Sequence, residues 1–264
     1  MKSAVLALLL LASSLAGAQT SLVVMGSSTV YPLMTDIARR FESLHPGVSI
    51  DVRSGGSGKG IADLRGGASD IAMVSRQLTD KERDLFPFPL CRDGAAIVVH
   101  RSNTLKGLSS RQLAELLTGK VTDWQQLGAR PGAIKLVWRT ETQAIPELVL
   151  THLKLKPEQV RGHITIFENA DAIRFVANDR NAITMAALGV AELSIKSGAP
   201  IKLLAYGGIP ASSRTVGDRT YLLSRPLTLV TRSPPTGLQK QLVDYAASGA
   251  VTDLHEKHGF VPYR

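Results

Sequence analysis

The sequence is poor in cysteine, with Cys91 the single example among 264 residues. One cysteine excludes an internal disulfide, so the fold must be stabilised by its own hydrophobic core. The composition allows such a core, because 44% of the residues are hydrophobic and 20% are charged. These proportions exclude a wholly disordered chain, and we expect Cys91 to pack as a small apolar residue without a function of its own.

Aromatic residues are also scarce, at 5% of the chain. So few rings argue against a surface that stacks nucleobases, and the basic residues are scattered singly or in pairs. We therefore expect no nucleic-acid partner. The 31 basic and 22 acidic residues give a formal net charge of +9, which favours small anionic partners by raising their concentration near the surface.

Long apolar segments are missing apart from one near the N-terminus. Residues 4–12 form an apolar run that follows Lys2 and precedes the small residues 16–18. The run is too short to span a bilayer, and this order is typical of a cleaved export signal, which we place at residues 1–18. No cysteine follows the cleavage site, so we expect a periplasmic protein without a lipid anchor.

Short β-rich runs alternate with amphipathic helical stretches along the remaining chain. We expect strands at 21–25, 48–52, 71–74, 95–100, 134–138, 163–167, 182–185, 201–205 and 226–231. We expect helices at 32–44, 61–65, from Ser109-Ser110 to Gly119, and at 145–153, 171–178 and 238–247. This alternation predicts an α/β fold with parallel or mixed sheets, and the number of elements suits two lobes.

Segments rich in serine and glycine follow the first two expected strands, directly before helices. The first is GSST at 26–29, ahead of Pro32, and the second is SGGSGKG at 54–60. Hydroxyls and free N–H groups at a helix N-terminus are suited to binding an anion. The alternatives are an ordinary helix cap for the first segment and a flexible loop for the second. The second is not a Walker A loop, because Gly60 stands where a serine or threonine would bind magnesium.

Arginines follow two further strands. Ser75-Arg76 ends the strand at 71–74, and Arg139 directly follows the strand at 134–138. Ligands of open α/β sheets bind at the carboxyl ends of the strands, where these side chains would lie. Each arginine taken singly is more typical of a solvated surface, whereas four such junctions together favour an anion site.

These junctions resemble those of the phosphate-binding proteins of bacterial ABC transporters. The matching segments run in order along the chain: GSSTVYPL (26–33), SGGSGKGI (54–61), SDIAMVSRQLTDKE (69–82), TDWQQLG (122–128), RTET (139–142), GGIPASSRTV (207–216), YLLSRPLTLV (221–230) and HGFVP (258–262). The resemblance implies a type II periplasmic-binding-protein fold, with two lobes of mixed sheets flanked by helices and a ligand cleft between them. We expect one lobe at 19–101 plus 205–264 and the other at 102–204, with crossings near 100–103 and 203–207.

The resemblance also implies a site that holds phosphate with backbone N–H groups, hydroxyls and arginines, without metal or cofactor. By position it carries over the ligand-binding residues Ser27, Ser28, Thr29, Ser57, Arg76, Arg139, Glu141 and Thr142. Ser54 is an alternative to Ser57. Glu141 either orients Arg139 or accepts the proton that phosphate carries and sulfate lacks, which would repel sulfate.

The second-lobe half of this pattern departs from the family. Gln143-Ala144-Ile145 stands where the family has Ser-Gly-Thr, so two hydroxyl donors are missing. The Gly-Tyr usual in the strand at 182–185 is absent as well. The ligand or its affinity is therefore open at this point.

The resemblance implies a monomeric solute-binding protein that captures inorganic phosphate, or a similar tetrahedral oxyanion, and delivers it to the permease subunits of an ABC transporter. One alternative is an anion sensor or adaptor with another membrane partner. A second is a secreted serine hydrolase, but none of the six histidines lies in a recognisable catalytic motif, and we expect no enzyme. His255 and His258, three residues apart, indicate a solvated helix end rather than a metal site.

Overall fold

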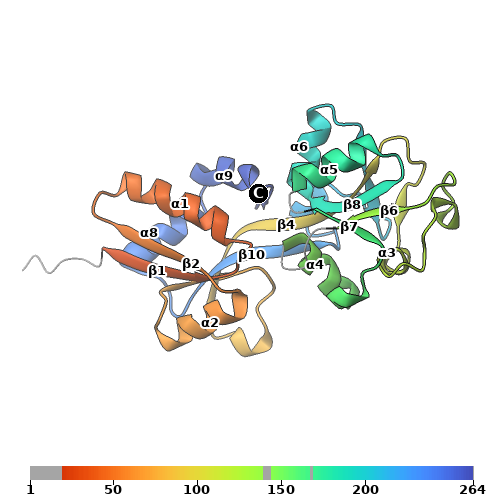
Figure 1. Ribbon diagram of the computed structural model, residues 1–264. Helices are drawn as coiled ribbons and strands as arrows, with labels where there is room; N and C mark the ends of the chain where they lie inside the picture. Colours follow the sequence, from red (N-terminus) through yellow and green to blue (C-terminus); the bar gives the residue numbers. More distant parts are fainter. Residues whose placement is uncertain (1–19, 139–143, 167–168, 264) are drawn as a thin grey trace, which may run out of the picture.

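The computed structural model describes residues 20–138, 144–166 and 169–263, so the expected export signal at 1–18 lies outside the described residues. Figure 1 shows two lobes joined by two strands, β4 (Phe86–His100) and β10 (Ser224–Thr231). Helices lie on the outer faces of the strands in both lobes. The two-lobed α/β fold expected from the sequence is confirmed.

The other elements are as follows. The strands are β1 (Ser21–Gly26), β2 (Ser49–Ser54), β3 (Ile71–Val74), β5 (Gly107–Leu108), β6 (Lys135–Trp138), β7 (His163–Thr165), β8 (Ala182–Ala187), β9 (Ile201–Tyr206) and β11 (Val261–Pro262). The α-helices are α1 (Tyr31–Leu44), α2 (Ser57–Gly66), α3 (Ser110–Leu117), α4 (Ala144–Leu153), α5 (Asn169–Asn178), α6 (Leu188–Lys196), α7 (Ser213–Gly217), α8 (Gly237–Ala246) and α9 (Thr252–Lys257). Short 3₁₀ helices are η1 (Asp80–Glu82), η2 (Trp124–Leu127), η3 (Pro157–Gln159) and η4 (Gly249–Val251).

In the first lobe the strand order is β2-β1-β3-β10-β4. β1 pairs in parallel with both β2 and β3, whereas β10 runs antiparallel to β3 and β4. All four residues of β3 are buried, as expected for a strand covered on both faces. α1 packs on the sheet through residues at helical spacing, among them Leu33, Ile37 and Phe41, each at most 1% exposed. Cys91 is fully buried in this core, which confirms its expected packing role.

The second lobe contains β8, β6 and β7, with β9 on the other side of β4. β6 pairs in parallel with β7 and β8, and β4 pairs antiparallel with β8 and β9. Trp124 anchors this core, where its indole N–H donates to the Asn181 carbonyl. Ser109 caps α3 in a capping box with Gln112, as its position before Leu113 predicts.

The long strand β4 belongs to both lobes. Its residues 86–94 pair with β10, and its residues 95–99 pair with β8. At about 3.3 Å per residue a strand of 15 residues extends for roughly 50 Å, which is enough to run through both sheets. Leu90 belongs to the core of the first lobe and Ala95 to the core of the second.

The chain therefore crosses between the lobes near 93–95 and returns near 223–225, rather than near 100–103 and 203–207. On the return, Leu223 packs in the second core and Leu227 in the first. Tyr206 and Val216 also pack in the second core, although both follow the expected return point. We accordingly propose lobe boundaries at these crossings in place of 19–101, 102–204 and 205–264.

Among the elements that the sequence pattern did not predict are the first half of β4 and the helix α6. The first half of β4 contains Pro87 and Pro89, which argue against a strand, but β4 is the last strand in the order of the first sheet. Proline is tolerated at such an edge because no ladder hydrogen bond needs its missing N–H.

α6 follows β8 directly, without turn residues between Ala187 and Leu188, so the sequence shows no boundary between strand and helix. Within the described ranges, no helix is long and apolar enough to cross a bilayer.

Candidate anion-binding site

Three parallel strands bring the serine-rich segments to one edge of the first sheet. In the register of β1 with its neighbours, Gly26 lies opposite both Ser54 of β2 and Met73 of β3. Because the three strands are parallel and neighbouring, the segments that follow them leave from the same edge. The sequence-predicted residues Ser27, Ser57 and Arg76 therefore lie near one another.

Gly26 joins two of these segments directly. Its carbonyl accepts the N–H groups of Gly55 and Gly56, each at 2.8 Å, and Ser27 N–H donates to the Met73 carbonyl at 2.9 Å. A Cβ at Gly26 would lie 2.3 Å from the Met73 oxygen, and one at Gly60 would lie 2.6 Å from the Met25 oxygen. Both glycines are required for this close approach of backbones. α2 begins at Ser57, before the expected start at 61, although the glycines of this segment have low helix propensity.

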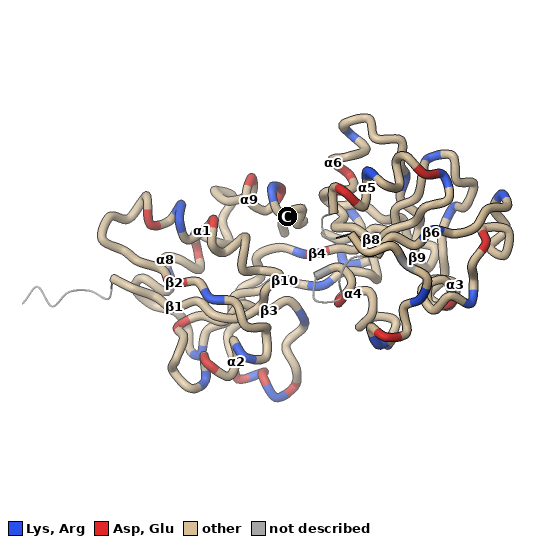
Figure 2. The backbone as a smooth tube through the Cα atoms, viewed as in Figure 1, with Lys and Arg blue, Asp and Glu red and all other residues tan. Residues whose placement is uncertain are grey.

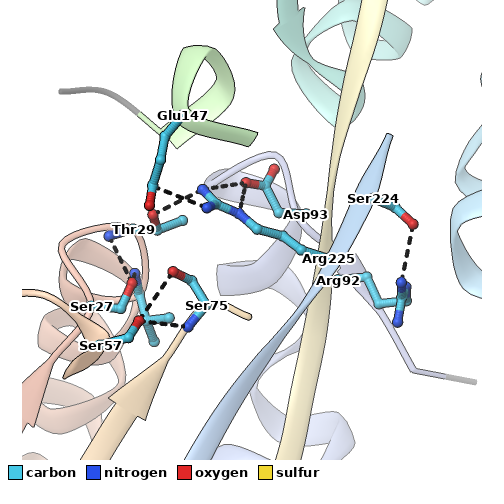
Figure 3. A network of polar contacts seen from close by, with 10 residues as sticks. Ser27, Thr29, Ser57, Ser75, Arg92, Asp93, Glu147, Ser224 and Arg225 are labelled. Atoms are coloured by element: carbon cyan, nitrogen blue, oxygen red, sulfur yellow. Dashed lines mark hydrogen bonds and ion pairs between the residues drawn. The ribbon is translucent and has the colours of Figure 1, made fainter. Parts of the chain in front are cut away.

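Four hydroxyl groups gather here, and we call Ser27, Thr29, Ser57 and Ser75 the hydroxyl cluster (Figure 3). The Ser27 Oγ accepts the N–H groups of Thr29 at 3.2 Å and Val30 at 3.4 Å. The Ser57 Oγ accepts the Ser75 N–H at 3.1 Å and lies 3.5 Å from the Ser75 Oγ. A serine oxygen that accepts from backbone keeps its own O–H to donate. The Ser27 O–H can therefore donate to a neighbouring acceptor, and of the paired Ser57 and Ser75 hydroxyls at least one can do the same, because either may donate to the other.

The guanidinium beside this cluster belongs to Arg225 of β10, which the sequence analysis did not single out. Its Nη2 donates to the Thr29 Oγ1 at 3.1 Å, and its Nη1 donates to the Glu147 Oε2 at 3.0 Å. Its Nε and Nη2 each lie 3.4 Å from the Asp93 Oδ2. The side chain is 9% exposed, and Figure 2 shows basic positions on both crossing strands. Arg225 lies in the matched segment YLLSRPLTLV, the one signal that marks it.

Asp93 is the buried counterpart of Arg225. It lies opposite Arg225 in the β4–β10 register and is 1% exposed. Burial raises the pKa of the Asp93 carboxyl, because removal from water penalises its charged form, and the nearby Arg225 charge offsets only part of this effect. The two residues form a charged pair inside the strand crossing.

Arg76 ends β3 next to Ser75, but its guanidinium is bound by a carboxylate. Its Nη1 and Nη2 donate to the two Glu82 oxygens at 2.8 and 2.9 Å, and Nη1 also donates to the Gln77 carbonyl. This fork lowers the pKa of Glu82 to about 2, and the Thr79 N–H adds to the effect. The structure therefore brings the Arg76 charge to the same edge while holding its donors on Glu82.

The remaining predicted residues divide into two groups. Ser28 is exposed in the loop between β1 and α1, and Ser54 is exposed at the end of β2. Arg139, Glu141 and Thr142 lie outside the described residues. The second lobe contributes Glu147 of α4 to the contacts seen around Arg225.

His255 of α9 and His258, which follows this helix, do not form the solvated helix end expected from the sequence. His255 is 2% exposed, and the His258 Nε2 lies 3.0 Å from the Asp36 Oδ2 of α1. The expectation was wrong for His255 because α9 packs its inner face against the first-lobe core through the neighbouring Leu254. Across the described part of the chain, no three His, Cys, Asp or Glu side chains gather in a way that could hold a metal ion.

The fold and the site together are those of an α/β binding protein. Two strands cross between its two lobes, and the hydroxyl cluster lies at the end of parallel strands. The chain belongs to the PBP superfamily, whose domain it matches over residues 12–250.

Individual relatives match either most of the chain or part of it. The phosphate-binding protein PstS of Bacillus subtilis is 26% identical over 250 residues, which are 93% of this chain and 81% of that protein. Phosphate-binding protein PstS 2 of Streptococcus pneumoniae is 37% identical over 107 residues, which are 40% of this chain and 37% of that protein.

Solved structures share the fold. An ABC-type phosphate transport receptor from Vibrio cholerae superposes with a TM-score of 0.81 at 24% identity, over 91% of this chain and 99% of that one. A substrate-binding protein of a phosphate ABC transporter from Clostridium perfringens, described as putative and solved with bound phosphate, has a TM-score of 0.67 at 25% identity. That match covers 92% of this chain and all of the other.

Proposed function

We propose that this protein is a periplasmic solute-binding protein that captures inorganic phosphate between its lobes and delivers it to the permease of an ABC transporter. The names of the B. subtilis relative and of the phosphate-bound C. perfringens structure support this ligand and this transport system. Delivery by hinge closure, a monomeric state and the absence of catalysis are parts of the same proposal.

The observation that carries the proposal is the donor character of the hydroxyl cluster. The Ser27 and Ser57 oxygens accept backbone N–H groups, so the Ser27 O–H and one O–H of the Ser57–Ser75 pair can donate to a ligand. A tetrahedral oxyanion offers only acceptor atoms apart from its own protons, so it matches this set. Arg225 and Arg76 add positive charge at the same edge. Hydrogen bonds to a charged group contribute roughly 1.5–3 kcal/mol each, so a few of them give tight binding.

The proposed ligand set keeps the residues expected from the sequence. In the first lobe these are Ser27, Ser28, Thr29 and Ser57, with Arg76 contributing mainly charge because Glu82 holds its guanidinium. In the second lobe they are Arg139, Glu141 and Thr142. Glu141 is the proposed acceptor for the phosphate proton.

Isothermal titration calorimetry tests this proposal. We expect one phosphate per chain and much weaker binding of sulfate, because sulfate has no proton to share with a carboxylate. Arg139→Ala should weaken phosphate binding more than tenfold, or about 1.4 kcal/mol. A wild-type protein that binds neither anion, or binds sulfate as tightly as phosphate, would contradict the proposed ligand.

A thermal-shift panel with phosphate, arsenate, molybdate and sulfate identifies the ligand if phosphate is wrong. An anion that binds the folded state stabilises it by an amount that grows with the ratio of its concentration to its Kd, so the preferred ion gives the largest rise in melting temperature at equal concentration. We expect phosphate and arsenate to rank first, since both carry a proton near neutral pH.

A further inference from the structure

We propose that Arg225 is an interlobe tie that slows the release of the bound anion by holding Glu147 of the second lobe to the hydroxyl cluster of the first. This inference rests on the proposed function, because it concerns how the proposed site retains its ligand. It assigns a role to Arg225, Glu147 and Asp93, none of which is among the ligand-binding residues predicted from the sequence.

Asp93 holds the Arg225 guanidinium in place between the lobes. It lies opposite Arg225 where β4 and β10 cross between the lobes, and its Oδ2 lies 3.4 Å from two guanidinium nitrogens. Asp93 is 1% exposed and the Arg225 side chain is 9% exposed. A guanidinium held this way by the crossing strands keeps its position when either lobe moves.

Two further contacts of the guanidinium, one of them from the same Nη2, reach opposite lobes. Nη2 donates to the Thr29 Oγ1 at 3.1 Å, in the loop between β1 and α1 of the first lobe. Nη1 donates to the Glu147 Oε2 at 3.0 Å, in α4 of the second lobe. Figure 3 shows the Glu147 and Thr29 side chains on one side of the guanidinium and Asp93 on the other.

The Thr29 and Glu147 contacts of Arg225 differ in burial, and this difference determines which contact breaks first. Thr29 is 8% exposed, whereas the Glu147 side chain is 56% exposed. Water replaces the partner of an exposed charge at small cost, so the Glu147 contact is the one that breaks when the lobes separate. The Thr29 contact stays, and because arginine only donates, the Thr29 O–H remains directed away from it as a donor to the anion.

Glu147→Gln gives a sharp test, because it removes a negative charge near an anion site. Electrostatics alone predicts tighter phosphate binding for this variant. The tie predicts the reverse, namely phosphate dissociation about three- to fivefold faster in stopped flow, with the association rate within twofold of wild type. Glu158→Gln, which removes the same charge from exposed η3, is the matched control and should match the wild-type dissociation rate.

The dissociation rate of Glu147→Gln distinguishes an interlobe tie from simple electrostatic repulsion between Glu147 and the anion. Unchanged or slower phosphate dissociation in Glu147→Gln overturns the tie, and tighter binding would show that Glu147 competes with the anion for Arg225. Small-angle scattering without phosphate provides a second measurement, in which the variant should have a larger radius of gyration than wild type. Failure of the wild type to bind phosphate would instead refute the proposed function, so the two failures are distinguishable.

Discussion

Arg225→Ala should lower the free energy of unfolding by about 3–5 kcal/mol at pH 8. The change leaves Asp93, 1% exposed, without the cation that lies 3.4 Å from its Oδ2. An uncompensated buried charge is among the largest single-residue penalties in a folded protein. Chemical denaturation by urea, followed by circular dichroism, measures the loss.

The loss should shrink as the pH falls. Burial already raises the pKa of Asp93 in the folded protein, and removal of Arg225 takes away the main opposing effect. The folded variant then binds more protons than the unfolded chain at pH values above the unfolded pKa near 4. Stability therefore falls as pH rises through this window, and the deficit should be smaller at pH 5 than at pH 8.

Asp93→Asn combined with Arg225→Ala provides the control for this prediction. The double variant lacks both members of this charged pair, so Asp93 no longer carries an uncompensated charge and most of the stability that Arg225→Ala loses at pH 8 should be recovered. An equal deficit at both pH values, with no recovery in the double variant, would show that the loss comes from packing alone.

Gly60→Ala should destabilise the protein by about 1–3 kcal/mol and weaken phosphate binding at least tenfold. The added Cβ would lie 2.6 Å from the Met25 oxygen and 2.7 Å from the Gly26 Cα, so α2 must move away from β1. This movement displaces Ser57, at the start of α2, relative to Ser27. Calorimetry with phosphate and urea denaturation measure the two effects.

Gly66→Ala is the matched control in the same helix. A Cβ at Gly66 meets no atom within 4 Å, and alanine restricts the unfolded chain more than glycine does. We expect this variant to gain about 0.4–1 kcal/mol of stability and to bind phosphate as wild type does. Equal effects of the two substitutions would mean that the contact between α2 and β1 does not position the site.

The hydroxyl segments of the first lobe could be predicted from the sequence, because each segment is recognisable from the residues directly beside it. Each hydroxyl segment directly follows a short apolar strand and precedes a helix, so Ser27 and Ser57 are identifiable one junction at a time. Their convergence needs only parallel pairing of β1, β2 and β3, which the alternation of strands and helices predicts.

Arg225, Asp93 and Glu147 could not be predicted in this way because their contacts are distant in sequence. Arg225 lies 132 positions from Asp93, 78 from Glu147 and 196 from Thr29. The pairing depends on the register of β10 with the part of β4 that crosses between the lobes. That register, and the continuity of β4 through its prolines, arise from tertiary packing rather than from any local pattern.

The central claim is that the O–H protons of Ser27 and Ser57 bind the phosphate anion. Calorimetric titration of Ser27→Ala/Ser57→Ala with phosphate tests it most directly, with Ser43→Ala on the exposed side of α1 as the control. Loss of two hydrogen bonds to a charged ligand predicts at least hundredfold weaker binding for the double variant, or about 2.7 kcal/mol, and wild-type affinity for the control. Phosphate binding at wild-type affinity by a folded double variant would contradict the account.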